Sequence, residues 1–187
     1  MPSGVDLDVV HMIFQIAFGW TDSHLHEFES NGIRYGQIEF GEDDPEMLDE
    51  RRYSLMDLLK NEGDAARYRY DFGDCWEFYL QLERVTAYDY DYKTMLFGKC
   101  IGGKRACPPE DVGGTDGYRR FLNVIEDPEH EERKELLEWL EIDFDPDSFD
   151  VDSVNMQIQS IAQQCNERYD QKKKAATVKR RKNRTQA

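Results

Sequence analysis

Residues 67–85 read RYRYDFGDCWEFYLQLERV, and this stretch predicts two neighbouring strands of a sheet. Tyr68, Tyr70 and Phe72 fall on one face of the first strand, because successive side chains of a strand point to opposite faces. Apolar side chains alternate again from Phe78 onward along the second strand. The residues Phe72-Gly73-Asp74 between the two are typical of a tight turn. An antiparallel pair is therefore expected here.

The flanking sequence adds a second hairpin and several helices to this pair. Asn31-Gly32 separates two alternating segments and is a frequent hairpin turn. Residues 41–52 and 86–97 have no clear period, and we expect loops there. Apolar residues at three-to-four spacing predict the helices, which span 8–18, 55–59, 117–125, 128–140 and 151–169. Together these elements predict an α+β fold, with an antiparallel sheet packed on one face by helices in a single domain, residues 1–170.

A conformationally restricted loop, GGKRACPPEDVGG, occupies residues 102–114. Each proline fixes its own φ and restricts the preceding residue, whereas the paired glycines permit close backbone approach. We expect a loop of defined shape that carries Lys104, Arg105, Glu110 and Asp111, as functional loops often do. The alternative is a rigid connector between the sheet and the helices that follow.

Charge is distributed unevenly along the chain, which has 39 acidic and 24 basic residues and a net charge of −15. Residues 171–187 hold eight basic residues and no acidic one, and we expect a disordered tail. An acidic body repels phosphate, so nucleic acid would be contacted only through this tail, if at all. No apolar run is long enough to span a membrane and no secretory signal is visible, which predicts a soluble, cytoplasmic protein with free thiols.

Several motifs together resemble the plasmid pRiA4b ORF-3-like family. They are FGWTDSHLHEF at 18–28, YDFGDCWE at 70–77, the loop at 102–114, Gly117-Tyr118, and FDP with FD at 144–150. The resemblance runs from about residue 5 to residue 158. It implies the fold and a binding face, but no reaction, because the family is one of unestablished biochemical function. It also implies an N-terminal strand, which is missing before the first helix here.

Two groups of residues are candidates for metal binding. Cys100 precedes the loop and Cys107 lies within it, and the two thiols are candidate zinc ligands. A structural zinc site needs four ligands, however, and isolated thiols are more often buried apolar groups. In relatives we expect further ligands where this chain has Phe78 and Val112. No cofactor is therefore predicted, with zinc as the alternative.

His24, His26 and Asp22 form the second group, and His11 is a further candidate. On a strand, His24 and His26 would share one face, and two imidazoles with a carboxylate bind Zn, Fe or Mn. The alternative is an exposed polar strand face, with Leu25 directed to the core.

Carboxylates form a third group, from Asp71, Asp74 and Glu77 near the sheet turn and Glu110 and Asp111 in the loop. If loop and turn meet in space, these groups would converge and could hold a cation or position basic groups of a partner. Alternatively, they cap turns and helices or pair with Arg105.

These observations lead to one favoured function and two alternatives. The favoured one is a binding module for a protein, peptide or small ligand, whose recognition face joins the loop to Trp20, Trp76 and Tyr118. The first alternative is a metal-dependent hydrolase or transferase that uses His24 and His26 with the Asp71, Asp74 and Glu77 group. The second is a plasmid or mobile-element accessory protein that touches nucleic acid through its tail.

Overall fold

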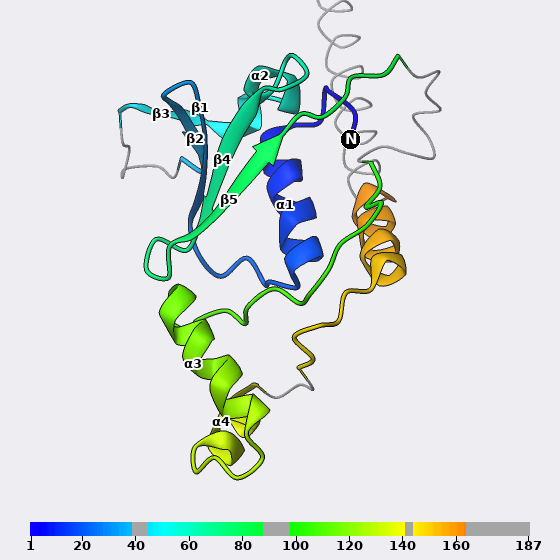
Figure 1. Ribbon diagram of the computed structural model, residues 1–187. Coiled ribbons are helices and arrows are strands. Elements are labelled where there is room, and N and C mark those ends of the chain that lie inside the picture. Colours follow the sequence, from blue (N-terminus) through cyan, green and yellow to red (C-terminus); the bar gives the residue numbers. More distant parts are fainter. Residues whose placement is uncertain (39–44, 88–97, 141–143, 164–187) are drawn as a thin grey trace, which may run out of the picture.

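The computed structural model describes residues 1–38, 45–87, 98–140 and 144–163. Its centre is one five-stranded sheet with strand order β3-β2-β1-β4-β5. Figure 1 shows the sheet with helices gathered on one of its faces and beyond one end. The α+β fold expected from the sequence is confirmed. The strands are β1 (His26–Ser30), β2 (Ile33–Gly36), β3 (Met47–Asp49), β4 (Ala65–Tyr70) and β5 (Trp76–Gln81).

The predicted pair at the centre of the sequence corresponds to β4 and β5, which are antiparallel with Tyr68 opposite Phe78 and Tyr70 opposite Trp76. Tyr68 and Tyr70 are fully buried, as their alternation predicted. Phe72 does not continue this face and is exposed. The strand ends at Tyr70, two residues before Phe72, because Asp71 adopts a left-handed backbone, with φ of 55°, and this breaks the alternation.

The first hairpin forms at the expected turn, since both Asn31 and Gly32 have positive φ. β1 also pairs with β4 on its other side, with Phe28 opposite Tyr68. The alternative that directed Leu25 to the core is wrong, because Leu25 is exposed and His26 is buried. Leu25 precedes the strand, so alternation with Phe28 fixes His26, not Leu25, on the inner face.

One edge strand was missed in the sequence. β3 lies in the segment 41–52 that was expected to be a loop, and it pairs with β2 in parallel. The sheet is therefore mixed, and antiparallel in its other pairings. Only three residues long and half-buried, β3 is too short to show a recognisable period. The 3-10 helix η1 (Glu50–Arg52) follows it directly.

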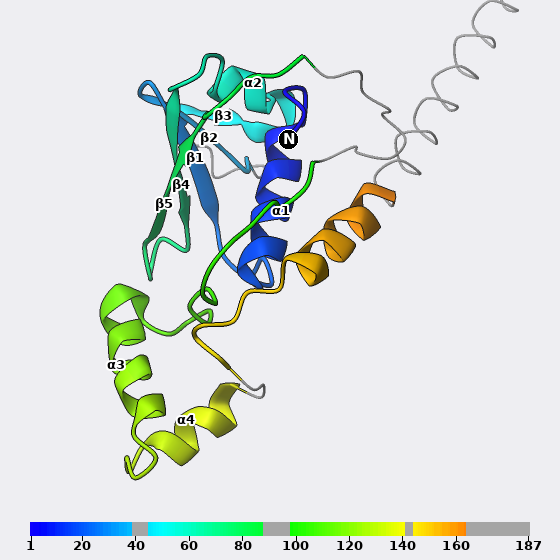
Figure 2. The same cartoon turned by 45° about the vertical axis from the view of Figure 1, so that its right-hand side comes forward.

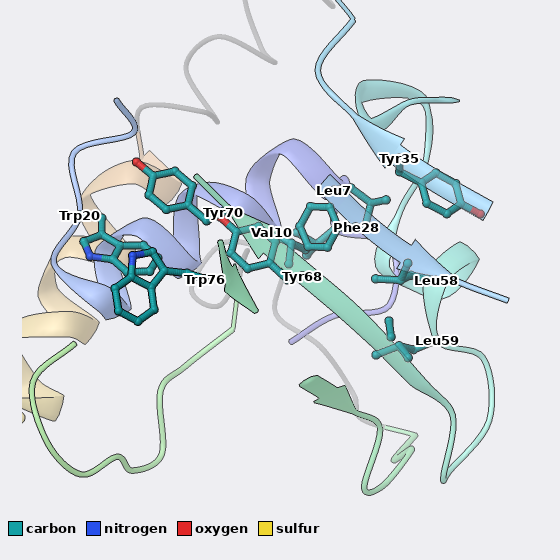
Figure 3. Packing of buried hydrophobic residues seen from close by; sticks show 12 residues of the cluster. Leu7, Val10, Trp20, Phe28, Tyr35, Leu58, Leu59, Tyr68, Tyr70 and Trp76 are labelled. Carbon is teal, nitrogen blue, oxygen red and sulfur yellow. The ribbon is translucent and has the colours of Figure 1, made fainter. Parts of the chain in front are cut away.

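Helix α1 (Leu7–Phe18) packs on the inner face of the sheet, and α2 (Leu55–Leu58) covers the end of the core near β1. The buried faces of α1 and the sheet meet in one aromatic core. Figure 3 shows its central members, among them Leu7, Val10, Phe28, Tyr68 and Tyr70. The core thus sits between α1 and the strands, at the positions that the two periods of the sequence indicate.

Residues 151–163 form a further helix on the outer side of α1. Ile13 of α1 packs against Val154 and Ile158 of this helix, in a second and smaller apolar cluster. Figure 2 shows the resulting order of layers, from sheet to α1 to C-terminal helix. The predicted continuation of this helix to residue 169 and the basic tail at 171–187 lie outside the described residues.

Helices α3 (Gly114–Glu126) and α4 (Arg133–Leu140) extend beyond the sheet at the end where β4 turns into β5 (Figures 1 and 2). α4 begins later than the predicted residue 128, because residues 128–132 form turns before the helix. Within the described part of the chain, no helix is long and apolar enough to cross a membrane.

Candidate functional site

The loop at 102–114 is fixed to distant parts of the chain on both sides of its exposed end. Before that end, the backbone N–H and C=O of Cys100 bond the Asn155 side chain, each at 2.9 Å. After it, the Ala106 N–H donates to the carbonyl of Pro146 at 3.0 Å. The Trp20 indole N–H then donates to the carbonyl of Pro108 at 2.8 Å. The loop therefore has a defined shape, as its prolines and glycines indicated.

Glu110 joins the loop to the end of the sheet. Its Oε2 accepts from the Thr21 backbone N–H at 3.0 Å and from the Thr21 hydroxyl at 2.6 Å, and its Oε1 accepts from the Tyr70 hydroxyl. Partial burial alone would raise the pKa of Glu110, but the bonds from Thr21 and Tyr70 outweigh burial and lower the pKa. Glu110 thus sits in the loop as a hydrogen-bonded carboxylate with Thr21 and Tyr70 as partners, whereas the structural alternative considered for it was a cap or a pair with Arg105.

The turn between β4 and β5 also contacts the loop. Asp74 accepts from the Gly113 backbone N–H at 3.0 Å through Oδ2. A side chain at Gly114 would lie 2.7 Å from the carbonyl oxygen of Asp74, so the two backbones approach closely. The convergence of loop and turn that the sequence left open does occur.

One histidine and two of these carboxylates meet at this junction. The Nε2 atom of His24 lies 3.1 Å from Oδ1 of Asp111 and 3.7 Å from Oδ2 of Asp71. The ligand atoms of the three residues all lie within 4.8 Å of one another. His24 comes from the segment before β1, Asp71 from the end of β4, and Asp111 from the loop. Three separate segments thus build one group of metal-ligating side chains.

His26 belongs to a different group, which is buried between the sheet and α1. Its ring stacks on that of His11 at a centroid separation of 3.4 Å, and its Nε2 lies 2.7 Å from Oε2 of Glu50. His11 lies 2.7 Å from Oδ1 of Asp22 through Nε2 and 2.8 Å from the Tyr68 hydroxyl through Nδ1. Burial lowers the pKa of His11, and the neighbouring His26 lowers it further, in spite of Asp22. The structure thus brings together His11, Asp22 and His26 and places His24 elsewhere.

Glu77 also lies apart from the other predicted carboxylates. On the open face of the sheet its Oε1 contacts both Arg67 and Arg69 at 3.1 Å. Such cross-strand pairs stabilise neighbouring strands. The residues of the proposed hydrolase or transferase, with His26 and Glu77 among them, are therefore not gathered at one place.

The two predicted loop thiols point to different apolar clusters. Cys107 packs against the main core, whereas Cys100 packs near Val154 in the second cluster. Burial raises the pKa of the Cys107 thiol to about 12, which keeps it neutral at physiological pH. Among the described residues, no cysteine joins a group of metal-ligating side chains.

The predicted aromatic residues support the loop from below. Trp20 and Trp76 are buried, and Tyr118 is half-buried against the main core. By contrast, Lys104 and Arg105 are exposed at the outer end of the loop. The sequence did not single out Thr21, Pro146 or Asn155 as anchors, although Asn155 interrupts an apolar helical stripe and this was an available signal.

Glu110 and Asp111 should respond differently to substitution. We expect Glu110→Ala to lower the free energy of unfolding by about 2 kcal/mol, because it removes three hydrogen bonds to a charged acceptor. Asp111→Asn should cost less than about 0.5 kcal/mol, because Asp111 is exposed and asparagine also tolerates its left-handed backbone, with φ of 61°. Urea unfolding of both variants measures the difference. Equal effects would show that Glu110 does not fasten the loop.

Comparison with known proteins agrees with this architecture. A family model described as plasmid pRiA4b ORF-3-like protein matches residues 1–153. The sheet, α1 and the fastened loop define an α+β domain of that class, and the chain belongs to the plasmid pRiA4b ORF-3-like family.

Two relatives illustrate the family. The uncharacterized protein y4hQ of Sinorhizobium fredii is 36% identical over 166 residues, which cover 87% of this chain and 82% of that protein. The crystal structure of MM3350, a protein of unknown function from Methanosarcina mazei Go1, matches with a TM-score of 0.66 and 34% identity. That match covers 81% of this chain and 84% of the other. The family resemblance drawn from the motifs is confirmed, and neither name carries an activity.

Proposed function

We propose that this protein is a binding module, and that the exposed end of the loop recognises an acidic segment of a partner protein. This exposed end, called the basic tip below, consists of residues 101–105. The observation that carries the proposal is the pair of anchors on either side of it, Cys100 with Asn155 and Ala106 with Pro146. A preformed loop loses little conformational entropy on binding, which favours affinity.

The composition of the basic tip indicates the chemistry of the partner. Lys104 and Arg105 project from it, and Ile101 beside them is 94% exposed. Arg105 makes a long ion pair with the exposed Asp147, whose Oδ1 lies 3.8 Å from its Nε. The overall negative charge of the chain does not forbid an acidic partner, because at physiological ionic strength charges are screened beyond about 8 Å. An apolar contact at Ile101 flanked by two cations suits a segment that mixes acidic and aliphatic residues.

The aromatic residues serve this function from below the surface. Trp20 holds Pro108 through its indole N–H, and Tyr118 packs against the main core, as Cys107 of the loop also does. Their role is to keep the loop in its binding shape, as the supporting residues of a preorganised site do.

A peptide-binding experiment tests the proposal. Fluorescently labelled peptides that alternate Glu with Leu would be titrated by anisotropy against the wild type and a K104E/R105E variant. We expect salt-sensitive binding to the wild type and a loss of about tenfold or more in the variant, because two attractive contacts become repulsive.

The matched control reverses two cations elsewhere, in an R119E/K134E variant on α3 and α4, where both side chains are exposed. This variant should bind as the wild type does. Equal binding by all three proteins, or none by the wild type, would contradict the proposal.

A further inference from the structure

We propose that His24, Asp71 and Asp111 bind one divalent transition-metal cation, of which Zn²⁺ is the representative. One imidazole and two carboxylates form a set that suits Zn, Mn or Fe(II) better than Ca²⁺ or Mg²⁺, which prefer oxygen ligands only. The site is separate from the basic tip and does not rest on its role in binding a partner.

The spacing of the ligand atoms fits a shared ion. Two ligands on a tetrahedral zinc ion stand about 3.3 Å apart, given metal–ligand distances of about 2.0–2.1 Å. The Nε2 atom of His24 lies 3.1 Å from Asp111 and 3.7 Å from Asp71, on either side of that value. The third separation, between the oxygens of Asp71 and Asp111, is within 4.8 Å, and the exposed Asp111 side chain has room to move toward a shared ion.

The buried ring nitrogen of His24 gives a second and independent reason. Its Nε2 atom is shielded from solvent and has no hydrogen-bond partner among the described residues, although Asp111 is only 3.1 Å away. The carboxylate oxygen lies off the N–H direction, so the contact is not a hydrogen bond. When two ligand atoms bind one cation, each points at the cation and not at the other ligand, which gives the same geometry. A buried polar atom left without a partner is costly, and a bound ion would satisfy it.

Both inner ligands are already held in place. Oδ1 of Asp71 accepts from the backbone N–H groups of Gly73 and Asp74, at 2.9 and 3.3 Å, while Oδ2 faces His24. The backbone N–H of His24 in turn donates to the Tyr70 hydroxyl at 3.3 Å. Neighbouring groups that orient metal ligands in this way raise affinity.

Access and charge are also suitable. The Asp71 side chain is 10% exposed whereas that of Asp111 is 68% exposed, so the site has a fixed inner wall and an outer ligand open to solvent. The carboxylates of Asp71 and Asp111 supply negative charge that a divalent cation balances. Solvent would complete the coordination. The ion would then tie the loop to the end of β4.

Metal titration of the full chain tests this assignment. Protein stripped with a chelator would be titrated with Zn²⁺ by calorimetry, using wild type, His24→Asn and Asp111→Asn. We expect one site in the wild type and a loss of about 100-fold or more in both variants, because changes in outer-shell groups alone cost 10–100-fold. Zinc should also raise the melting temperature of the wild type, and not that of either variant.

Two controls make the outcome decisive. His130→Asn removes a histidine in the turn between α3 and α4, and Asp116→Asn removes an exposed carboxylate of α3, and both should bind zinc as the wild type does. Circular dichroism checks that Asp111→Asn, a change at an exposed residue, is folded. Wild-type affinity in the His24 and Asp111 variants would place the ion elsewhere, for example at His11 and His26, and would overturn the assignment. Absence of zinc binding in the wild type would mean that the three side chains only contact one another, and this result would overturn the assignment as well.

The peptide-binding proposal and the zinc-binding proposal can be tested independently of each other. K104E/R105E should retain zinc binding, and His24→Asn should retain peptide binding when no metal is present.

Discussion

Replacing Trp20 with alanine is expected to lower the free energy of unfolding by about 3–5 kcal/mol, as truncation of a buried large aromatic residue does. Trp20 is 7% exposed and stacks on Tyr70 at a centroid separation of 4.7 Å. Its ring also meets Phe18 and Phe78 edge to face. Truncation would leave a cavity among these rings and would remove the bond to Pro108 that holds the loop.

Urea unfolding followed by circular dichroism measures this loss. Trp139→Ala is the matched control, because Trp139 on α4 is 47% exposed and its truncation should change stability far less. Trp20→Phe separates the two contributions, since it keeps a ring in the core and loses the hydrogen bond, at about 1 kcal/mol. A stable Trp20→Ala protein would show that the ring is a surface contact residue and not a core residue.

Gly117→Ala should also lower the free energy of unfolding strongly, although it adds only one methyl group. A side chain at Gly117 would place its Cβ 1.9 Å from the carbonyl oxygen of Val112, where no real structure tolerates it. Val112 itself packs against the main core, so it moves only at the expense of that packing. We expect a loss of about 3 kcal/mol, corresponding to a melting temperature lower by about 10 °C.

Gly102→Ala provides the control for this substitution. Gly102 lies in the loop that precedes α3, and a side chain there would meet nothing within 4 Å. Its melting temperature, measured by differential scanning calorimetry, should stay close to that of the wild type. Similar losses in both variants would mean that the start of α3 is not held against Val112.

Local patterns were sufficient to predict most of the elements. The alternation around Tyr68 and Tyr70 and the Asn31-Gly32 turn identified the central strands, because period and turn chemistry are properties of a few adjacent residues. The sequence did not predict the parallel strand β3. Its pairing with β2 depends on residues outside β3, and its three positions show no period. The early end of β4 was likewise not predicted, because it depends on the left-handed backbone of Asp71, which no sequence pattern indicates.

For the site, the sequence identified its residue types but not their grouping. The sequence grouped five carboxylates on the condition that loop and turn meet. Asp71, Asp74, Glu110 and Asp111 lie at that junction, whereas Glu77 pairs with Arg67 and Arg69 of the sheet. His24 and His26, two residues apart, were a candidate metal-binding pair, and instead they join different groups. The reason is that His26 lies in β1 and faces the core, while His24 precedes the strand and turns toward the loop.

The sequence by itself determined the α+β class, the family and the defined shape of the loop, because these follow from periodicity, motif order and the restricted dihedrals of proline. Only the tertiary structure decided which carboxylate became a structural acceptor at Tyr70 and which stayed exposed beside His24. That choice depends on the docking of residues 102–113 against β4 and on the segment before β1. Contacts between positions so far apart in the chain are set by packing, which local sequence does not encode.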